Sequence, residues 1–319
     1  MGITPFPNGV SSFGSVLTSP LWPGLPTRVG RHFFVDAVNG NNGRNGRSPD
    51  RAFATVQAGV NAATDGNGDT IWVFPGSYAE TLDITKRDLA IIGASGRHPG
   101  RTQIIGDGTT ARATIRVDTG FARGFVLANL EVDTNGVARP AVHIVSDNTG
   151  ALNATYGDAW WWLHNVRVNS GNDTLPSAAL YLDAAIAGYV TDCMWANCTI
   201  GIAISAGLNL EPDNVQFWNN RFWDNVTADI ATVQKATTAF TAGAVLSMTN
   251  MHWFRPMFMD RGGTPVTNYA NIAGGTHVNC GFYDFYAARD VADATLMQLP
   301  VDFIALGHSA GGVESIIGA

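Results

Sequence analysis

One pentapeptide near the end of the chain has the pattern of a serine nucleophile. Gly307-His308-Ser309-Ala310-Gly311 fits the G-x-S-x-G motif, and a strand-like run, 301–306, precedes it. In hydrolases with this motif the acid and the histidine follow the serine along the chain, but no histidine follows Ser309. We therefore expect a glycine-rich turn here and not a catalytic elbow.

Several carboxylates lie in or beside predicted strands. Hydrolysis of a glycosidic bond needs two carboxyl groups that face one groove about 5 to 9.5 Å apart. No Asp-Asp doublet and no Gly-His-Gly accompanies the candidates, so we favour turn aspartates that bond their own backbone and predict no catalytic residue. The candidates are Asp133, Asp183, Asp192, Asp224 and Asp229.

Tryptophan is the most suggestive residue type for binding. Trp160, Trp161 and Trp162 are consecutive, and Trp195, Trp218, Trp223 and Trp253 follow. Such rings suit sugar stacking, the interior of a wide solenoid or a seam between subunits. In a strand, Trp160 and Trp162 share one side and Trp161 takes the other, so at least one ring faces away from its own coil.

Metal and cofactor sites are not expected. Cys193, Cys198 and Cys280 are odd in number, lie in strand-like segments and include no CxxC pair, which favours buried, reduced thiols. The seven histidines are dispersed without ligand spacing.

The segment 33–80 indicates the architecture that must position these residues. A strand at 33–35 leads into a Gly/Asn loop, Thr55 can cap a short helix expected near 55–64, and a buried strand at 71–74 ends at Pro75-Gly76. A lone amphipathic helix before a stack of short strands can plug the open end of the stack. We predict an all-β fold, a right-handed parallel β-helix (a single-stranded solenoid) with an N-terminal capping helix.

A weak internal repeat supports this prediction. Asparagine followed by a short apolar-x-apolar strand recurs at intervals of 36, 32, 23 and 30 residues. Asparagine tolerates the left-handed backbone of a tight bend and can bond its equivalent one coil away. We expect a ladder formed by Asn129, Asn165, Asn197, Asn220 and Asn250.

The amino-acid composition limits the classes of partner that we expect. Charged residues make up 14% of the chain and the formal net charge is −7 without a basic run, so nucleic acid is not expected. No apolar run is long enough for a membrane span, and no secretory signal opens the chain. The low charge suggests a surface covered by copies of the chain itself or by a partner.

Three segments are expected along the chain: an extended arm over 1–30, the β-helix over 31–288, and a cap or self-association segment over 289–319. The arm is rich in proline yet carries many apolar side chains, which favours ordering against another molecule over packing along its own domain. Its expected partner-binding residues are Phe6, Val10, Phe13, Leu17, Leu21, Trp22 and Leu25.

Two stretches resemble known proteins. Residues 33–80 resemble the N-terminal cap and first coil of pectate-lyase-like right-handed β-helix proteins. The start, Ile3-Thr4-Pro5-Phe6-Pro7-Asn8-Gly9-Val10, is similar to the leader of many tailed-bacteriophage virion proteins. The resemblance implies a virion component, typically trimeric, that serves as a capsid decoration or cement protein or as a spike.

We therefore expect a bacteriophage structural protein without enzymatic activity, most simply a homotrimeric capsid decoration protein. Its arm would attach it to the major capsid protein or another virion protein, on the surface of a particle assembled in the host cytoplasm. The alternative is a tailspike or receptor-binding protein that binds host surface polysaccharide or cuts it as a depolymerase or lyase.

Overall fold

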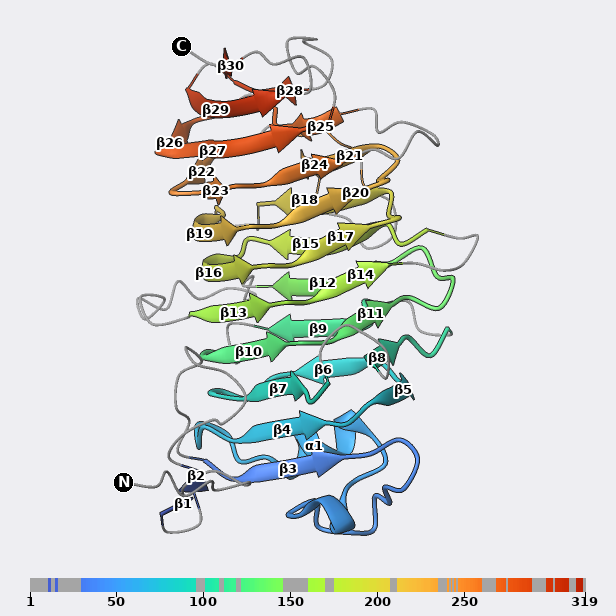
Figure 1. Ribbon diagram of the computed structural model, residues 1–319. Helices are drawn as coiled ribbons and strands as arrows, with labels where there is room; N and C mark the ends of the chain where they lie inside the picture. Colours follow the sequence, from blue (N-terminus) through green and yellow to red (C-terminus); the bar gives the residue numbers. More distant parts are fainter. Residues whose placement is uncertain are drawn as a thin grey trace, which may run out of the picture.

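The chain folds into a right-handed parallel β-helix whose coils stack along one axis (Figure 1). The computed structural model describes residues 11–12, 15–16, 30–95, 101–108, 112–118, 122–145, 160–169, 175–206, 211–234, 240, 242, 244, 246–259, 268–273, 275–288, 297–300, 302–309 and 314–317. The fold class predicted from the sequence is confirmed.

The strands form three faces, on each of which a strand pairs in parallel with its counterparts in the neighbouring coils. Face 1 contains β3 (His32–Val35), β4 (Thr70–Val73), β7 (Ala90–Gly93), β10 (Phe125–Ala128), β13 (Trp161–His164), β16 (Ile186–Thr191), β19 (Asp213–Trp218), β22 (Met248–Thr249), β23 (His252–Phe254), β26 (His277–Val278), β27 (Cys280–Ala287) and β29 (Phe303–Ser309). Face 2 contains β5 (Gly76–Ala79), β8 (Thr102–Ile105), β11 (Glu131–Asp133), β14 (Arg167–Asn169), β17 (Met194–Ala196), β20 (Arg221–Trp223) and β24 (Met257–Met259). Face 3 contains β6 (Leu82–Ile84), β9 (Ile115–Asp118), β12 (Pro140–Val145), β15 (Ala178–Asp183), β18 (Ile200–Ser205), β21 (Ala228–Thr232), β25 (Asn268–Asn271) and β28 (Met297–Gln298).

Further elements lie at the two ends of the stack. The short strands β1 (Ser11–Ser12) and β2 (Ser15–Val16) pair antiparallel, and β30 (Glu314–Ile317) pairs antiparallel with β29. A 3-10 turn, η1 (Pro49–Arg51), and the helix α1 (Val56–Ala62) lie beside the first coils (Figure 1). Among the described residues, no helix is both long and apolar enough to cross a membrane.

Helix α1 is the capping helix that the sequence predicted. Thr55 precedes it with an extended backbone, and its hydroxyl accepts a hydrogen bond from the N–H of Ala58 (3.3 Å). The backbone N–H groups of the first two helical residues have no partner within the helix, and a residue distant in sequence accepts from both. Glu80 Oε1 accepts from the N–H of Val56 (2.7 Å) and Oε2 from that of Gln57 (2.8 Å). One carboxylate thus ties the helix to the end of β5.

Replacing Glu80 by alanine should lower the free energy of unfolding by about 1 to 3 kcal/mol, because two partly buried backbone donors lose their acceptor. Chemical denaturation followed by circular dichroism measures the loss. Glu80→Gln is the control, since it keeps one acceptor oxygen and should lose less. Equal stability of Glu80→Ala and the wild-type chain would contradict the capping role.

A second buried carboxylate, Asp69, holds the chain where β4 begins. It accepts from the N–H groups of Arg31 (2.6 Å) and Thr64 (2.7 Å) and from Nδ2 of Asn67 (2.6 Å). Burial raises the pKa of Asp69, but these hydrogen bonds and the Arg31 guanidinium outweigh it, so the pKa lies below the ordinary 3.8.

The lowered pKa of Asp69 predicts an acid-dependent stability. In the unfolded chain the carboxyl is protonated below pH 3.8, while in the folded chain it stays ionised to a lower pH. The ionised carboxylate therefore contributes fully to the free energy of unfolding above pH 3.8, and this contribution is lost as the pH falls through the lowered pKa of the folded chain. Asp69→Asn should unfold more easily at pH 7, by about 1.5 to 3 kcal/mol, and the difference from wild type should shrink at acid pH. Urea titrations at several pH values measure it, and a constant difference would refute the assignment.

The core is a continuous column of inward side chains that changes character along the axis. The first coils bury mainly Val, Ile and Leu, whereas the later ones stack aromatic rings. The rings of Phe217 and Trp253 lie 4.8 Å apart and 4° from parallel, and Phe222 stacks on Phe258 at 5.2 Å. Parallel register places like positions over one another, so these rings stack directly on those of the neighbouring coil.

The bend between face 1 and face 2 uses the same backbone conformation in five successive coils. Each residue donates its N–H to a carbonyl of the face 1 strand in the next coil, for example Asn129 to the carbonyl of His164 (3.0 Å). Asn and Asp tolerate this left-handed conformation better than most residues. The five positions and their φ values are Asn129 (59°), Asn165 (53°), Asp192 (57°), Asn219 (55°) and Arg255 (52°).

The five asparagines chosen from the sequence do not form one ladder. Asn129 and Asn165 are stacked at the bend between faces 1 and 2, where Nδ2 of Asn165 donates to Oδ1 of Asn129 (2.8 Å). Asn197 lies after β17 and donates to Asn169 (2.5 Å), while Asn250 lies before β23 and accepts from Asn279 (2.8 Å).

Asn220 is a separate case, because it follows the bend residue Asn219 and is buried. Its Nδ2 donates to the carbonyl of Val190 (2.9 Å), inside the stack. The single ladder is therefore corrected to short stacks at three different bends. Coil lengths vary, so equal motifs in the sequence fall at different places on the coil.

Candidate functional site

The structure distributes the five candidate aspartates over different faces. Asp133 on β11, Asp183 on β15 and Asp229 on β21 are buried, whereas Asp192 and Asp224 occupy bends. Asp133 accepts from the N–H of Asn135 (2.8 Å), the local bond expected of a turn aspartate. Neither of the two depressions that the described residues form is lined by any of these five side chains.

The Gly307-His308-Ser309 segment is neither an elbow nor a turn. All three residues belong to β29 and pair in parallel with Phe285, Tyr286 and Ala287 of β27. The expected glycine-rich turn is wrong at these positions, because the pairing with β27 continues through Gly307. Ala310 and Gly311 lie outside the described residues.

The arm residues Phe6, Val10, Phe13, Leu17, Leu21, Trp22 and Leu25 lie outside the described residues. Cys193, Cys198 and Cys280 are buried free thiols, as predicted. Burial raises the pKa of Cys280 to about 11 and raises that of Cys198 well above its ordinary value, so neither is a reactive thiolate at neutral pH. In the described ranges, no three His, Cys, Asp or Glu side chains come together as a metal site would require.

The tryptophan run behaves as strand alternation predicts. Trp161 is fully buried in the core, while Trp160 and Trp162 are only partly buried and pack on the outside of face 1. On the two preceding coils, β10 and β7, the positions in register with Trp162 and His164 hold Val126 and Ala128, and Ala90 and Ile92, which are buried. The outward side of face 1 is thus aliphatic on β7 and β10, between Trp72 on β4 and the aromatic residues that begin at β13.

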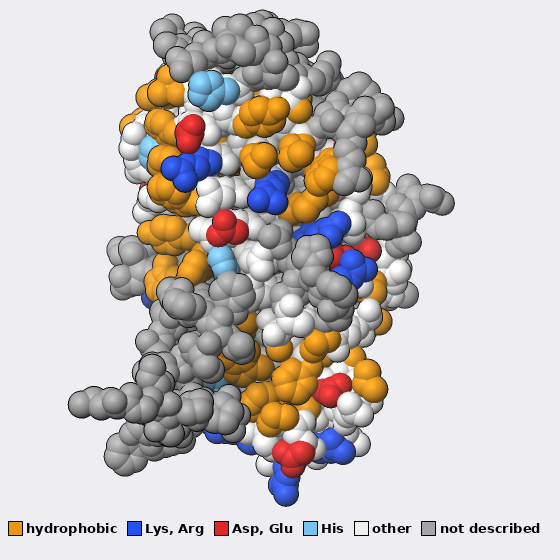
Figure 2. All heavy atoms as spheres, in the orientation of Figure 1, with side chains coloured by type: hydrophobic (Ala, Val, Ile, Leu, Met, Phe, Trp, Pro, Cys, Tyr) orange, Lys and Arg blue, Asp and Glu red, His pale blue; other side chains and the backbone are white. Residues whose placement is uncertain are grey.

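Three successive coils build an aromatic surface at this point, which we call the shelf. It consists of Trp160, which precedes β13, Trp162 on β13, Tyr189 and Thr191 on β16, and Trp218 on β19. Tyr189 is 46% exposed and Trp218 is 39% exposed, although both are large rings. They border an open depression of about 390 Å³. Figure 2 shows hydrophobic side chains gathered over the coils on this side of the molecule.

Hydrogen bonds fix the floor of the shelf. Nε1 of Trp162 donates to Oγ1 of Thr191 (2.8 Å), and the same hydroxyl lies 2.8 Å from Nδ1 of His164. The hydroxyl of Thr191 thus bridges the indole and the imidazole, and the His164 tautomer decides which of Oγ1 and Nδ1 supplies the proton between them. The carboxylate of Asp192 lies 3.6 Å from Nδ1 of His164 at the edge of the shelf.

The aromatic surface continues toward the C-terminal coils. The ring of Trp218 stacks on Phe254 at 4.0 Å and 19°, and Phe254 stacks on Tyr283 at 5.1 Å and 19°. These residues are in register on β19, β23 and β27. A column of outward rings therefore runs along the axis, at a spacing of about 4.8 Å per coil.

A charged cluster lies on face 2, around Glu131. Its carboxylate is 3.1 Å from Nη1 of Arg101 and 3.9 Å from Nε of Arg167, and it accepts from Nε2 of Gln103 (3.2 Å). Burial raises the pKa of Glu131, and the two arginines oppose that shift. Because the carboxylate is buried and hydrogen-bonded, we assign the cluster to the cohesion of three coils.

Face 3 carries a Ser, Asp and His grouping that the sequence did not reveal. Ser205 Oγ donates to Asp183 (3.3 Å) and bonds the hydroxyl of Tyr181 (2.7 Å), while His143 lies 3.6 Å from Asp183. In a nucleophilic triad the serine contacts the histidine, but here both contact the aspartate. Ser205 is also fully buried, so the grouping is structural. Only register brings these residues together, from β12, β15 and β18.

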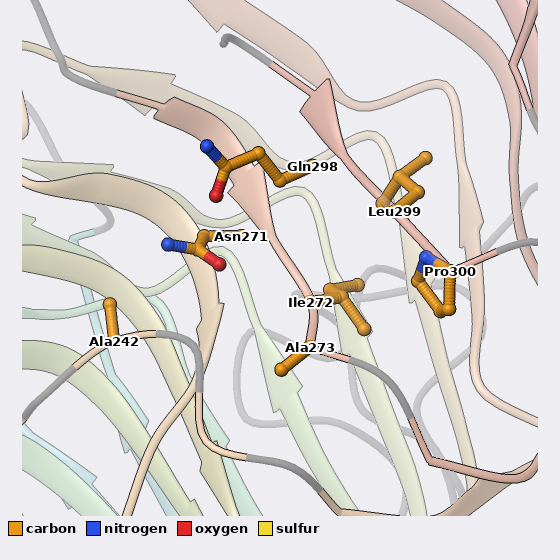
Figure 3. Close-up of a pocket in the computed structure, with 7 residues that line it drawn as sticks. All are labelled: Ala242, Asn271, Ile272, Ala273, Gln298, Leu299 and Pro300. Atoms are coloured by element: carbon orange, nitrogen blue, oxygen red, sulfur yellow. The ribbon is translucent and has the colours of Figure 1, made fainter. Parts of the chain in front are cut away.

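A second depression, of about 470 Å³, lies near the C-terminal end (Figure 3). The amides of Asn271 and Gln298 lie near each other on neighbouring strands, and Ala242, Ile272, Ala273, Leu299 and Pro300 complete the described lining. No ionisable side chain lines it. The shelf has the more distinctive chemistry, because four large rings converge there.

No family model matches the chain, and none of the curated proteins matches it at a meaningful level of similarity. Solved structures with a similar course of the backbone exist. The pectin methylesterase from Aspergillus niger has a TM-score of 0.46 at 14% identity, over 98% of this chain and 92% of that chain. The pectin methylesterase from Erwinia chrysanthemi has a TM-score of 0.45 at 15% identity, over 89% and 90%. A pectate lyase has a TM-score of 0.37 at 11% identity, over 81% and 77%.

These likenesses concern the fold and carry no activity over to this chain. They do correct one expectation. We predicted a protein without enzymatic activity because known linear motifs are missing, yet the similar structures are named as esterases and lyases. The prediction was wrong in its reasoning: a β-helix can bring side chains of neighbouring coils together, as it does for His143, Asp183 and Ser205, and no short motif records such a juxtaposition.

Proposed function

We propose that the protein binds a polysaccharide and that the shelf is the contact surface. One observation carries the proposal: large rings from three successive coils, partly buried on β13 and exposed on β16 and β19, lie on the same side of face 1. An exposed aromatic surface of this kind costs solubility unless a ligand uses it. Sugar rings present C–H groups on their faces and hydroxyls at their edges, which suits a flat ring surrounded by hydrogen-bonding groups.

The shelf also has groups that can transfer protons. Asp192 and His164 adjoin it and lie within 3.6 Å of each other. A carboxylate that orients an imidazole is a common arrangement for general acid–base chemistry. We assign any turnover of the bound polysaccharide to these two residues.

The experiment is a combined binding and turnover assay on the full chain. Neutral and acidic bacterial capsular polysaccharides and lipopolysaccharide are the probes; intrinsic tryptophan fluorescence reports binding, and new reducing ends or unsaturated sugars report cleavage. We expect a fluorescence change that saturates. Turnover that disappears in Asp192→Asn with binding retained would support the acid–base assignment. Absence of binding to all probes would refute the proposal.

The setting in a bacteriophage particle is a separate proposal. It rests on the similarity of residues 3–10 to virion leaders and on the apolar, proline-rich composition of 1–30. We infer a homotrimeric spike or capsid-bound protein, attached through this segment to another virion protein. Deleting residues 1–30 should abolish incorporation into particles and leave the circular dichroism of the β-helix unchanged. Retained incorporation would exclude the segment as the anchor.

A further inference from the structure

The described residues that line the shelf have no formal charge at neutral pH. They carry three indoles, one phenol and one hydroxyl. The hydroxyl of Thr191 is already engaged with Trp162 and His164. A ligand therefore meets ring faces and neutral edges, and none of these five described residues is a cation that could receive a carboxylate.

The charges around the shelf also disfavour an acidic ligand. Asp192 stands at its edge with a side chain that is 47% exposed. The arginines of the neighbouring coils lie on face 2 or at bends: Arg167 points to Glu131 (3.9 Å), and Arg255 pairs with Asp284 (3.2 Å). Arg221 is exposed on β20, beyond the bend at Asn219. The whole chain has a formal net charge of −7.

We propose that the shelf selects an uncharged glycan and discriminates against polyuronates and other acidic chains. This inference rests on the function proposed above and names its substrate class. A carboxylate placed on the rings would lose hydration without gaining a partner, and Asp192 would repel it. A neutral chain loses no charge hydration, and its C–H faces are complementary to the rings. The discrimination follows from charge complementarity and does not depend on which neutral sugar is bound.

The test uses an array of neutral and acidic polysaccharides in which each acidic member has its carboxyl-reduced counterpart. Reduction removes the charge and keeps linkage and length, so each pair is matched. We expect the reduced member to bind the full chain at least tenfold more tightly than its parent, with little dependence on salt. Tighter binding of the acidic parents, weakened by salt, would overturn the inference and leave the proposed function intact. Binding of no glycan at all would overturn both.

Three variants locate the effect. Trp218→Ala should lose binding to neutral members. Asp192→Asn should reduce the difference in affinity between the acidic and the carboxyl-reduced polysaccharides severalfold, because the repelling charge is removed. Arg221→Ala should leave both unchanged within twofold, and a selective loss of acidic ligands in that variant would show that an anion site exists and refute the proposal.

A second copy of the chain is the competing occupant of the shelf. Sedimentation velocity of the wild-type chain and of Trp218→Ala distinguishes it. We expect the same oligomeric state for both proteins. Dissociation caused by Trp218→Ala would assign the shelf to contacts between copies and overturn the inference.

Discussion

Replacement of Trp218 by alanine is expected to weaken polysaccharide binding at least tenfold, which corresponds to about 1.4 kcal/mol or more. Trp218 is the outermost indole of the shelf, and its ring is held by Phe254 at 4.0 Å. A rigid, exposed ring loses little entropy when a ligand covers it, so its removal costs most of the stacking energy. Fluorescence titration or calorimetry on the full chain measures the change.

Tyr286→Ala is the matched control for Trp218→Ala. Tyr286 is 44% exposed, close to the exposure of Trp218, but it lies on β27 outside the shelf. We expect its binding to stay within twofold of wild type. Circular dichroism should be unchanged in both variants, because both side chains are outward. Equal loss in the two variants would mean that any exposed ring contributes, and would contradict a localised site.

Gly188→Ala should lower the free energy of unfolding by about 1 to 3 kcal/mol, although it adds only one methyl group. A Cβ at this position would lie 2.0 Å from Cζ2 of Trp161. The indole has little freedom to yield, because it is fully buried and its Nε1 donates to the carbonyl of Ile186 (2.8 Å). Denaturant titration measures the loss.

A double-mutant cycle identifies the cause of that loss. In a Trp161→Phe background, which removes the crowded part of the indole, the cost of Gly188→Ala should be smaller. Gly43→Ala is the control substitution, since Gly43 is exposed and its nearest neighbour is Oδ1 of Asn41 at 3.2 Å. An unchanged cost of Gly188→Ala in the Trp161→Phe chain would show that the contact with Trp161 is not responsible.

The sequence predicted those features that depend on local patterns. The capping helix follows from Thr55 and the spacing of apolar residues, and alternation in a strand separates Trp161 from its two neighbours. Both predictions need only a few consecutive residues. They could be made without knowing how one coil aligns with the next.

The features that were missed depend on register between coils. Asp192 and Arg255 occupy the same bend as Asn129, so a search for asparagine alone could not align the column. Tyr189 and Trp218 join Trp162 only because variable bends bring β13, β16 and β19 into line. The sequence contained the signal of exposed aromatic residues, but not their juxtaposition.

The direction of the hydrogen bonds gives the molecule an uneven resistance to tension. In the parallel faces, strands lie across the long axis and their backbone bonds point along it, from coil to coil. A pull along the axis would load the bonds of one coil at a time and peel the end coil away. A pull across the axis, in the strand direction, would shear many bonds together and meet far greater mechanical strength.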